Sequence, residues 1–150
     1  QGLDAIPGLN ILADNVRNRL GIISFYIEGI HYNLIVRILN DKYGIQTRGG
    51  CACAGTYGHF LLEVSYEKSA EITEKINSGD LSEKPGWVRW SLHPTMTSEE
   101  VDLMITALKD IVENIETYKK DYTYENRTNV FWHKNEVSDH DLMRSWFMLD

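Results

Sequence analysis

The sequence has little of what marks several large classes of protein. Only 2 of its 150 residues are cysteines, and they stand one residue apart, so no framework of structural disulfides is expected. This favours a reducing, cytoplasmic compartment. No apolar run approaches the roughly 18 residues of a membrane helix, so no membrane is expected as a partner. Residues 1–10 lack the features of a signal peptide, and the missing initiator methionine indicates a fragment.

An excess of positive charge is also missing. Lysine and arginine together number 15 against 22 aspartates and glutamates, which gives a formal net charge of −7. Nucleic acids attract basic surfaces, so no nucleic-acid partner is expected. The hydrophobic fraction of 43% and the charged fraction of 25% are those of a globular protein, and the length suits one domain with a real core.

The periodicity predicts short strands mixed with amphipathic helices. Polar and apolar residues alternate over residues 20–28 and again over 87–92, as in half-buried strands. Residues 32–43 and 98–118 each carry an apolar stripe at helical spacing. We therefore predict an α+β fold: a small, mainly antiparallel sheet with these two helices packed on one face.

Weaker signals divide the rest of the chain. A short extended run after Pro7-Gly8 is predicted to pair antiparallel with residues 20–28, and residues 45–48 to form another strand. A polar helix is predicted over 66–78, and a strand or extended arm over 121–131. The last predicted helix carries a patch that would be a docking surface if exposed: Leu142, Met143, Trp146 and Phe147.

Two segments contain residues that are candidates for binding or catalysis. Residues 45–55 contain an arginine, three glycines and both cysteines, and a thiol beside a guanidinium is a candidate for the reactive thiolate form. The alternative is a glycine turn with two small buried cysteines. Arg89 stands in the short aromatic strand over 87–92, where an arginine departs from the usual strand composition. The alternative interpretation is that Arg89 is a surface charge on an edge strand.

The order of motifs resembles a known family. In chain order the motifs are Arg19-Leu20-Gly21-Ile22-Ile23-Ser24-Phe25, Gly44-Ile45, Arg48-x-Gly50-x-x-Cys53-Ala54, Val88-Arg89-Trp90-Ser91-Leu92 and Thr97-x-x-Glu100. Together they resemble the C-terminal small domain of class V aminotransferase-fold enzymes, which are pyridoxal-phosphate enzymes of fold type I and include cysteine desulfurases and selenocysteine lyases. The resemblance assigns 1–119 to this domain and leaves 120–150 as an extension that docks on the same domain or on a partner.

The resemblance implies roles for three residues. Cys53 falls on the nucleophile of the desulfurases, which takes sulfur from cysteine as a persulfide. Arg89 falls on the arginine that grips the α-carboxylate of the amino-acid substrate, and Arg48 on a second active-site arginine. A planar guanidinium suits a carboxylate because it binds both oxygens at once.

The resemblance also implies what else the enzyme contains. Pyridoxal 5'-phosphate is held by a lysine of a large domain that precedes this one in the parent chain, and no residue of this fragment is expected to bind it. A homodimer is expected, and the isolated fragment is expected to be inactive.

Two other functions remain open from the residues alone. The chain would serve as a non-catalytic α+β module for interaction or dimerisation if the arginines and cysteines were structural. It would bind a metal if the Cys-x-Cys pair were joined by His59 or His93, although zinc sites use wider spacing and more ligands.

Overall fold

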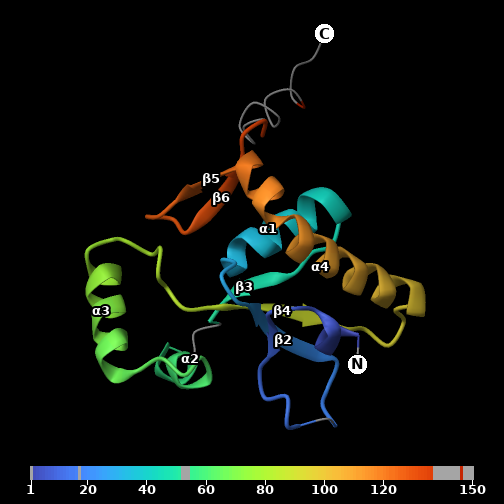
Figure 1. The fold of residues 1–150 in the computed structure, drawn as a ribbon, viewed down its shortest axis with the longest axis horizontal. Coiled ribbons are helices and arrows are strands. Elements are labelled where there is room, and N and C mark those ends of the chain that lie inside the picture. The colour runs from blue at the N-terminus through green and yellow to red at the C-terminus, as the bar shows by residue number, and fades with distance from the viewer. Residues whose placement is uncertain (1, 17, 52–54, 137–145, 147–150) are drawn as a thin grey trace.

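The computed structural model describes residues 2–16, 18–51, 55–136 and 146 (Figure 1). These residues form a four-stranded sheet, a separate two-stranded hairpin and the helices around them. The elements in chain order are η1 Leu3–Ala5, β1 Leu9–Ile11, β2 Ile22–Ile27, α1 Tyr32–Tyr43, β3 Arg48–Gly50, α2 Gly55–Leu61, α3 Tyr66–Asn77, β4 Trp87–Ser91, α4 Ser98–Tyr118, η2 Lys119–Asp121, β5 Tyr122–Glu125 and β6 Val130–His133.

The main sheet has the strand order β1–β2–β4–β3, and all of its pairs are antiparallel. The last strand to enter it, β4, is inserted between β2 and β3, which come earlier in the chain. The predicted pairing of the first two strands is confirmed, since Leu9 lies opposite Ile27 and Ile11 opposite Phe25. The register of each strand pair determines which side chains of neighbouring strands lie next to each other on the same face of the sheet.

Helices α1 and α4 cover one face of this sheet, as Figure 1 shows. Phe25 of β2 and Val88 of β4 are completely buried there. They pack in one cluster with the helical stripes, whose fully buried members are Ile35, Ile38, Leu39, Met104, Ala107, Leu108 and Ile111. The predicted α+β fold, with a small antiparallel sheet and helices on one face, is confirmed.

The ends of the long helices follow from local chemistry. In α1, the Nδ1 of His31 accepts the backbone N–H of Asn33, and Gly44 closes the helix in the left-handed region with φ 66°. In α4, Thr97 and Glu100 form the predicted capping box, each side chain accepting the other's backbone N–H. These signals depend on neighbouring residues only, so the sequence predicts them well.

The third strand starts later than predicted. The N–H of Ile45 still bonds the carbonyl of Leu39 at 3.0 Å, so the chain is tied to the end of α1 and pairs with β4 only from Arg48 onward. Gly49 then passes close to α1, where a Cβ would meet Tyr32 and the side chain of Asn33. The ambiguous run over 56–64 is mostly helix α2, and the polar helix α3 begins at its predicted cap, Ser65.

Hairpin β5–β6 lies against α1 rather than in the main sheet. The hydroxyl of Tyr122 donates to Asp41 at 3.1 Å, and Arg37 pairs with Glu136 at 2.7 Å. Of the predicted terminal helix, 138–145 and Phe147 lie outside the described residues, while Trp146 is helical and 68% exposed. No helix in the described parts of the chain is long and apolar enough to cross a membrane.

Candidate active site: the arginine face of the sheet

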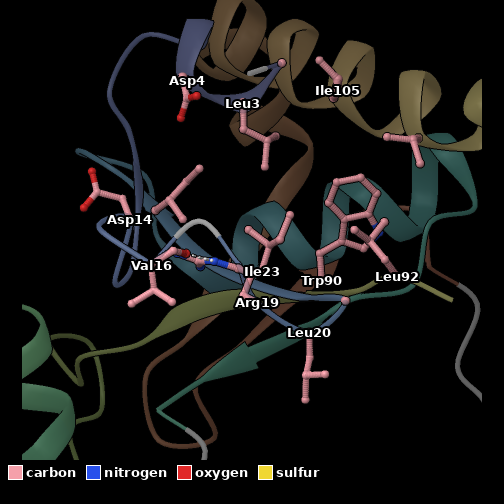
Figure 2. Close-up of a pocket in the computed structure, with 14 residues that line it drawn as sticks. Leu3, Asp4, Asp14, Val16, Arg19, Leu20, Ile23, Trp90, Leu92 and Ile105 are labelled. Atoms are coloured by element: carbon pink, nitrogen blue, oxygen red, sulfur yellow. Dashed lines mark hydrogen bonds between the residues drawn. The ribbon is translucent and has the colours of Figure 1, made fainter. Parts of the chain in front are cut away.

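A pocket of about 750 Å³ lies beside the start of α4 and the N-terminal turn, and Figure 2 shows its lining. The lining is mainly apolar, with Ile23, Trp90 and Ile105 among its walls. The guanidinium of Arg19 is committed to the loop, because it donates to the carbonyls of Val16 at 2.8 Å and Leu12 at 3.2 Å. The pocket contains neither of the arginines nor the cysteines that the sequence singles out.

Arg89 lies on the opposite face of the sheet. Side chains alternate along a strand, and its neighbours Val88 and Trp90 are buried on the side of α1 and α4. Arg89 therefore points away from the helix-covered core. Its strand β4 is central, with β2 on one side and β3 on the other, so the interpretation of Arg89 as a charge on an edge strand is wrong.

The sheet brings Arg48 next to Arg89. The two residues lie directly opposite each other in the β3–β4 pair, and Ser24 of β2 lies opposite Arg89 on its other side. Side chains at such positions have Cβ atoms about 4.5–5.5 Å apart, and two like charges placed there repel each other. The sequence predicts both arginines as site residues but not Ser24, because the position of Ser24 beside Arg89 depends on the register between strands.

The guanidinium of Arg89 is half-buried and short of partners. Among the described residues, its buried Nε has no hydrogen-bond partner, and no ion pair joins Arg89 or Arg48 to a carboxylate. Leaving a buried charged donor unsatisfied costs at least about 1–3 kcal/mol. An anion between the two arginines would remove both this cost and their repulsion.

The wall next to the arginines comes from the cysteine segment and α2. Trp87 shares the face of Arg89, and Gly58 of α2 lies so close that a Cβ on it would be 3.5 Å from the Trp87 ring and 3.4 Å from the Cβ of Cys51. Cys51 is a half-buried free thiol. Cys53 lies outside the described residues.

The arginine face has guanidinium groups that suit a carboxylate, but its strands have no lysine that could attach a carbonyl cofactor. Attachment needs a lysine that faces the site. The structure describes every lysine of the chain, and none of them lies on a strand of the main sheet. They are Lys42, Lys68, Lys75, Lys84, Lys109, Lys119, Lys120 and Lys134. The strands that carry the two arginines therefore supply no lysine for the attachment of pyridoxal phosphate. The prediction that no residue of these 150 binds the cofactor stays a prediction.

The two histidines considered for metal binding have other partners. His59 lies 2.6 Å from the hydroxyl of Ser69, and His93 lies 2.7 Å from that of Thr95. Among the residues with described positions, no group of three or more histidine, cysteine, aspartate or glutamate side chains could hold a metal ion.

Comparison with known proteins identifies a family for most of the chain. The family model of aminotransferase class-V matches residues 1–104, from before β1 into α4, and so includes Arg48, Arg89 and both cysteines. No curated protein matches the sequence. Hairpin β5–β6 lies outside the matched residues. Because the match covers well over half of the chain, this protein belongs to the class V aminotransferase family.

Proposed function

We propose that this chain is the C-terminal small domain of a pyridoxal-phosphate-dependent enzyme that acts on an amino acid. Arg89 and Arg48 bind the α-carboxylate of the substrate, and a large domain of the parent chain supplies the lysine that holds the cofactor. Pyridoxal phosphate, when bound, supplies the electron sink for amino-acid chemistry. A homodimer in the cytoplasm is part of the same proposal.

The observation that carries the proposal is the buried, unpartnered Nε of Arg89 beside Arg48. A carboxylate offers two oxygens in one plane, which match the fork of a guanidinium and supply the missing acceptor. A hydrogen bond to a charged group contributes about 1.5–3 kcal/mol. The unfavourable arrangement of the free protein thus becomes favourable when substrate is bound.

A cysteine desulfurase-like reaction is the finer form of this proposal. Cys53 is its nucleophile, and the family pattern Arg-x-Gly-x-x-Cys places that cysteine five residues after Arg48. Support comes from the described residues on either side of it, since Gly58 of α2 lies next to both Cys51 and the ring of Trp87.

The binding step can be tested on the 150-residue chain with acetate as the probe. We expect acetate to shift the Nε–H resonance of Arg89 in nuclear magnetic resonance spectra, with the shift saturating as the site fills. Acetate should also shift the backbone amide resonances of β3 and β4, and in Arg89→Lys, which lacks the Nε–H group, these amide shifts should be abolished. Arg127→Lys is the matched control, because Arg127 is an exposed arginine of the β5–β6 turn, and it should bind acetate normally. If acetate leaves Arg89 unaffected, the non-catalytic interaction module becomes the better function.

A further inference from the structure

Asn129 is the buried polar residue that joins hairpin β5–β6 to α1. Its side chain is 8% exposed, and its backbone adopts the left-handed region with φ 59°. Its Nδ2 donates to the hydroxyl of Tyr32 at 2.7 Å, and its Oδ1 accepts from the hydroxyl of Tyr124 at 2.9 Å. Its backbone carbonyl accepts from the side chain of Asn33 at 2.6 Å. Every kind of polar group on its side chain is therefore used.

The ring of Tyr32 lies directly on the two strands that carry the arginines. A Cβ on Gly86, which precedes β4, would be 2.5 Å from Cε1 and 2.6 Å from Cζ of this ring. A Cβ on Gly49, which follows Arg48 in β3, would be 3.1 Å from its Cδ2. Such close approach is possible only because both residues are glycine. The ring thus rests on the backbones of β3 and β4, from the side opposite the arginines.

The contact matters because β3 is weakly held. It is an edge strand of three residues, and it pairs with β4 alone. Short edge strands open at low free-energy cost unless something packs on them. The Tyr32 ring packs on Gly49 from the face that α1 covers. The hydrogen bond from Asn129 satisfies the buried hydroxyl of Tyr32 and so keeps the ring in place.

We propose that Asn129 and Tyr32 are positioning residues for the arginine pair. Asn129 holds the Tyr32 ring against Gly49 and Gly86, and the ring holds β3 in register with β4, so that Arg48 and Arg89 converge on one carboxylate. The proposal rests on the carboxylate site described above. It gives hairpin β5–β6, which lies beyond the family match, a role in substrate binding.

Two variants test the hydrogen bond between Asn129 and Tyr32, one by removing its acceptor and the other by removing its donor. Tyr32→Phe keeps the ring but removes the hydroxyl that accepts from Asn129. Asn129→Gly removes the side chain but tolerates the left-handed backbone and keeps the carbonyl that binds Asn33. Tyr124→Phe is the matched control, because it removes the other hydrogen bond of the Asn129 side chain without touching Tyr32.

The measurements are acetate affinity and the Nε–H resonance of Arg89 in the 150-residue chain, both taken well below the melting temperature of every variant. We expect Tyr32→Phe and Asn129→Gly to weaken acetate binding about fivefold or more and to move the acetate-free Arg89 resonance, whereas Tyr124→Phe changes neither. A lower melting temperature with unchanged affinity and resonance would mean that Asn129 is merely structural, and would overturn the proposal.

The two proposals fail in different ways. If the unmodified chain does not bind acetate, the carboxylate site itself is wrong. The acetate-free Arg89 resonance still reports the coupling in that case, since it depends on the surroundings of Arg89 and not on a ligand. Resonances identical in the parent chain and in both variants would then reject the positioning role as well.

Discussion

Arg89 combines a position that is costly for stability with a proposed role in substrate binding. It stands on a central strand with a buried, unpartnered Nε, next to a second arginine. We expect Arg89→Lys in the parent enzyme to raise KM about 10- to 150-fold, which corresponds to the loss of one charged hydrogen bond of about 1.5–3 kcal/mol. Lysine keeps the charge but loses the planar fork. Steady-state kinetics with the amino-acid substrate measures the effect, and an unchanged KM would contradict the assignment.

The two cysteines provide a comparison at the same scale. If the reaction is desulfuration, Cys53→Ser should abolish sulfur transfer while leaving substrate binding intact, because a hydroxyl is a poor substitute for the thiolate nucleophile. Cys51→Ser should have a smaller effect, because Cys51 occupies a variable position of the Arg-x-Gly-x-x-Cys pattern. Sulfide release and substrate binding, measured on both variants, separate the outcomes. Full activity of Cys53→Ser would favour an aminotransferase or another class V reaction.

His31 makes stability depend on pH. Burial lowers its pKa below the ordinary value of 6.5, and its Nδ1 must stay unprotonated to accept the N–H of Asn33 at the start of α1. As the pH falls below about 6.5, the unfolded chain takes up a proton that the folded chain resists, so the free energy of unfolding decreases. Urea denaturation between pH 7.5 and 5 measures this loss.

His31→Asn serves as the control for this pH dependence. Asparagine is a good N-cap and does not titrate, so the variant should lose less stability over the same pH range. An equal loss in both proteins would assign the dependence to other groups.

Among the elements, α4 depends on its first turn. Thr97 and Glu100 satisfy each other's backbone N–H groups there, and the helix supplies much of the core through Met104, Leu108 and Ile111. We expect Thr97→Ala to cost about 1 kcal/mol of unfolding free energy, within the range of about 0.5–2 kcal/mol for such caps. Thr106→Ala, at an exposed position of the same helix, should be neutral or slightly stabilising. Equal effects of the two changes in denaturant unfolding would exclude a capping contribution.

The junction of β3, β4 and α1 depends on the absence of side chains. A methyl group on Gly86 would collide with the buried Tyr32 ring, so Gly86→Ala should destabilise the chain by about 1–3 kcal/mol, as overpacking does. In helix α2, a Cβ on Gly58 meets its neighbours at ordinary contact distance, and Gly58→Ala should be tolerated. Thermal unfolding of both variants tests this, and a fully stable Gly86→Ala would show that the ring moves freely.

For the whole molecule, we expect no catalysis by the 150-residue chain alone. It carries the two arginines of the proposed carboxylate site but no lysine on the main sheet to attach pyridoxal phosphate. Incubation with cysteine and pyridoxal phosphate should release no sulfide or alanine above a blank without protein. Release above that blank would show that the chain forms a cofactor site by itself.

The sequence by itself determined the features that depend on near neighbours. The end of α1 at Gly44, the capping box at Thr97 and the alternation that turns Arg89 away from Val88 all follow from residues within four positions of each other. The motifs also predict Arg48 and Arg89 as site residues, and this assignment stays a prediction.

Only the tertiary structure decided which distant residues meet. Strand order placed β4 between β2 and β3, and register placed Arg48 opposite Arg89, neither of which periodicity can specify. The hydrogen bond from Asn129 to Tyr32 joins residues 97 positions apart. Such contacts form because the core packs one particular way, with hairpin β5–β6 against α1 and the Tyr32 ring on two glycines. No local sequence pattern predicts that packing, since Asn129 and Tyr32 are each an ordinary polar or aromatic residue in their own segment.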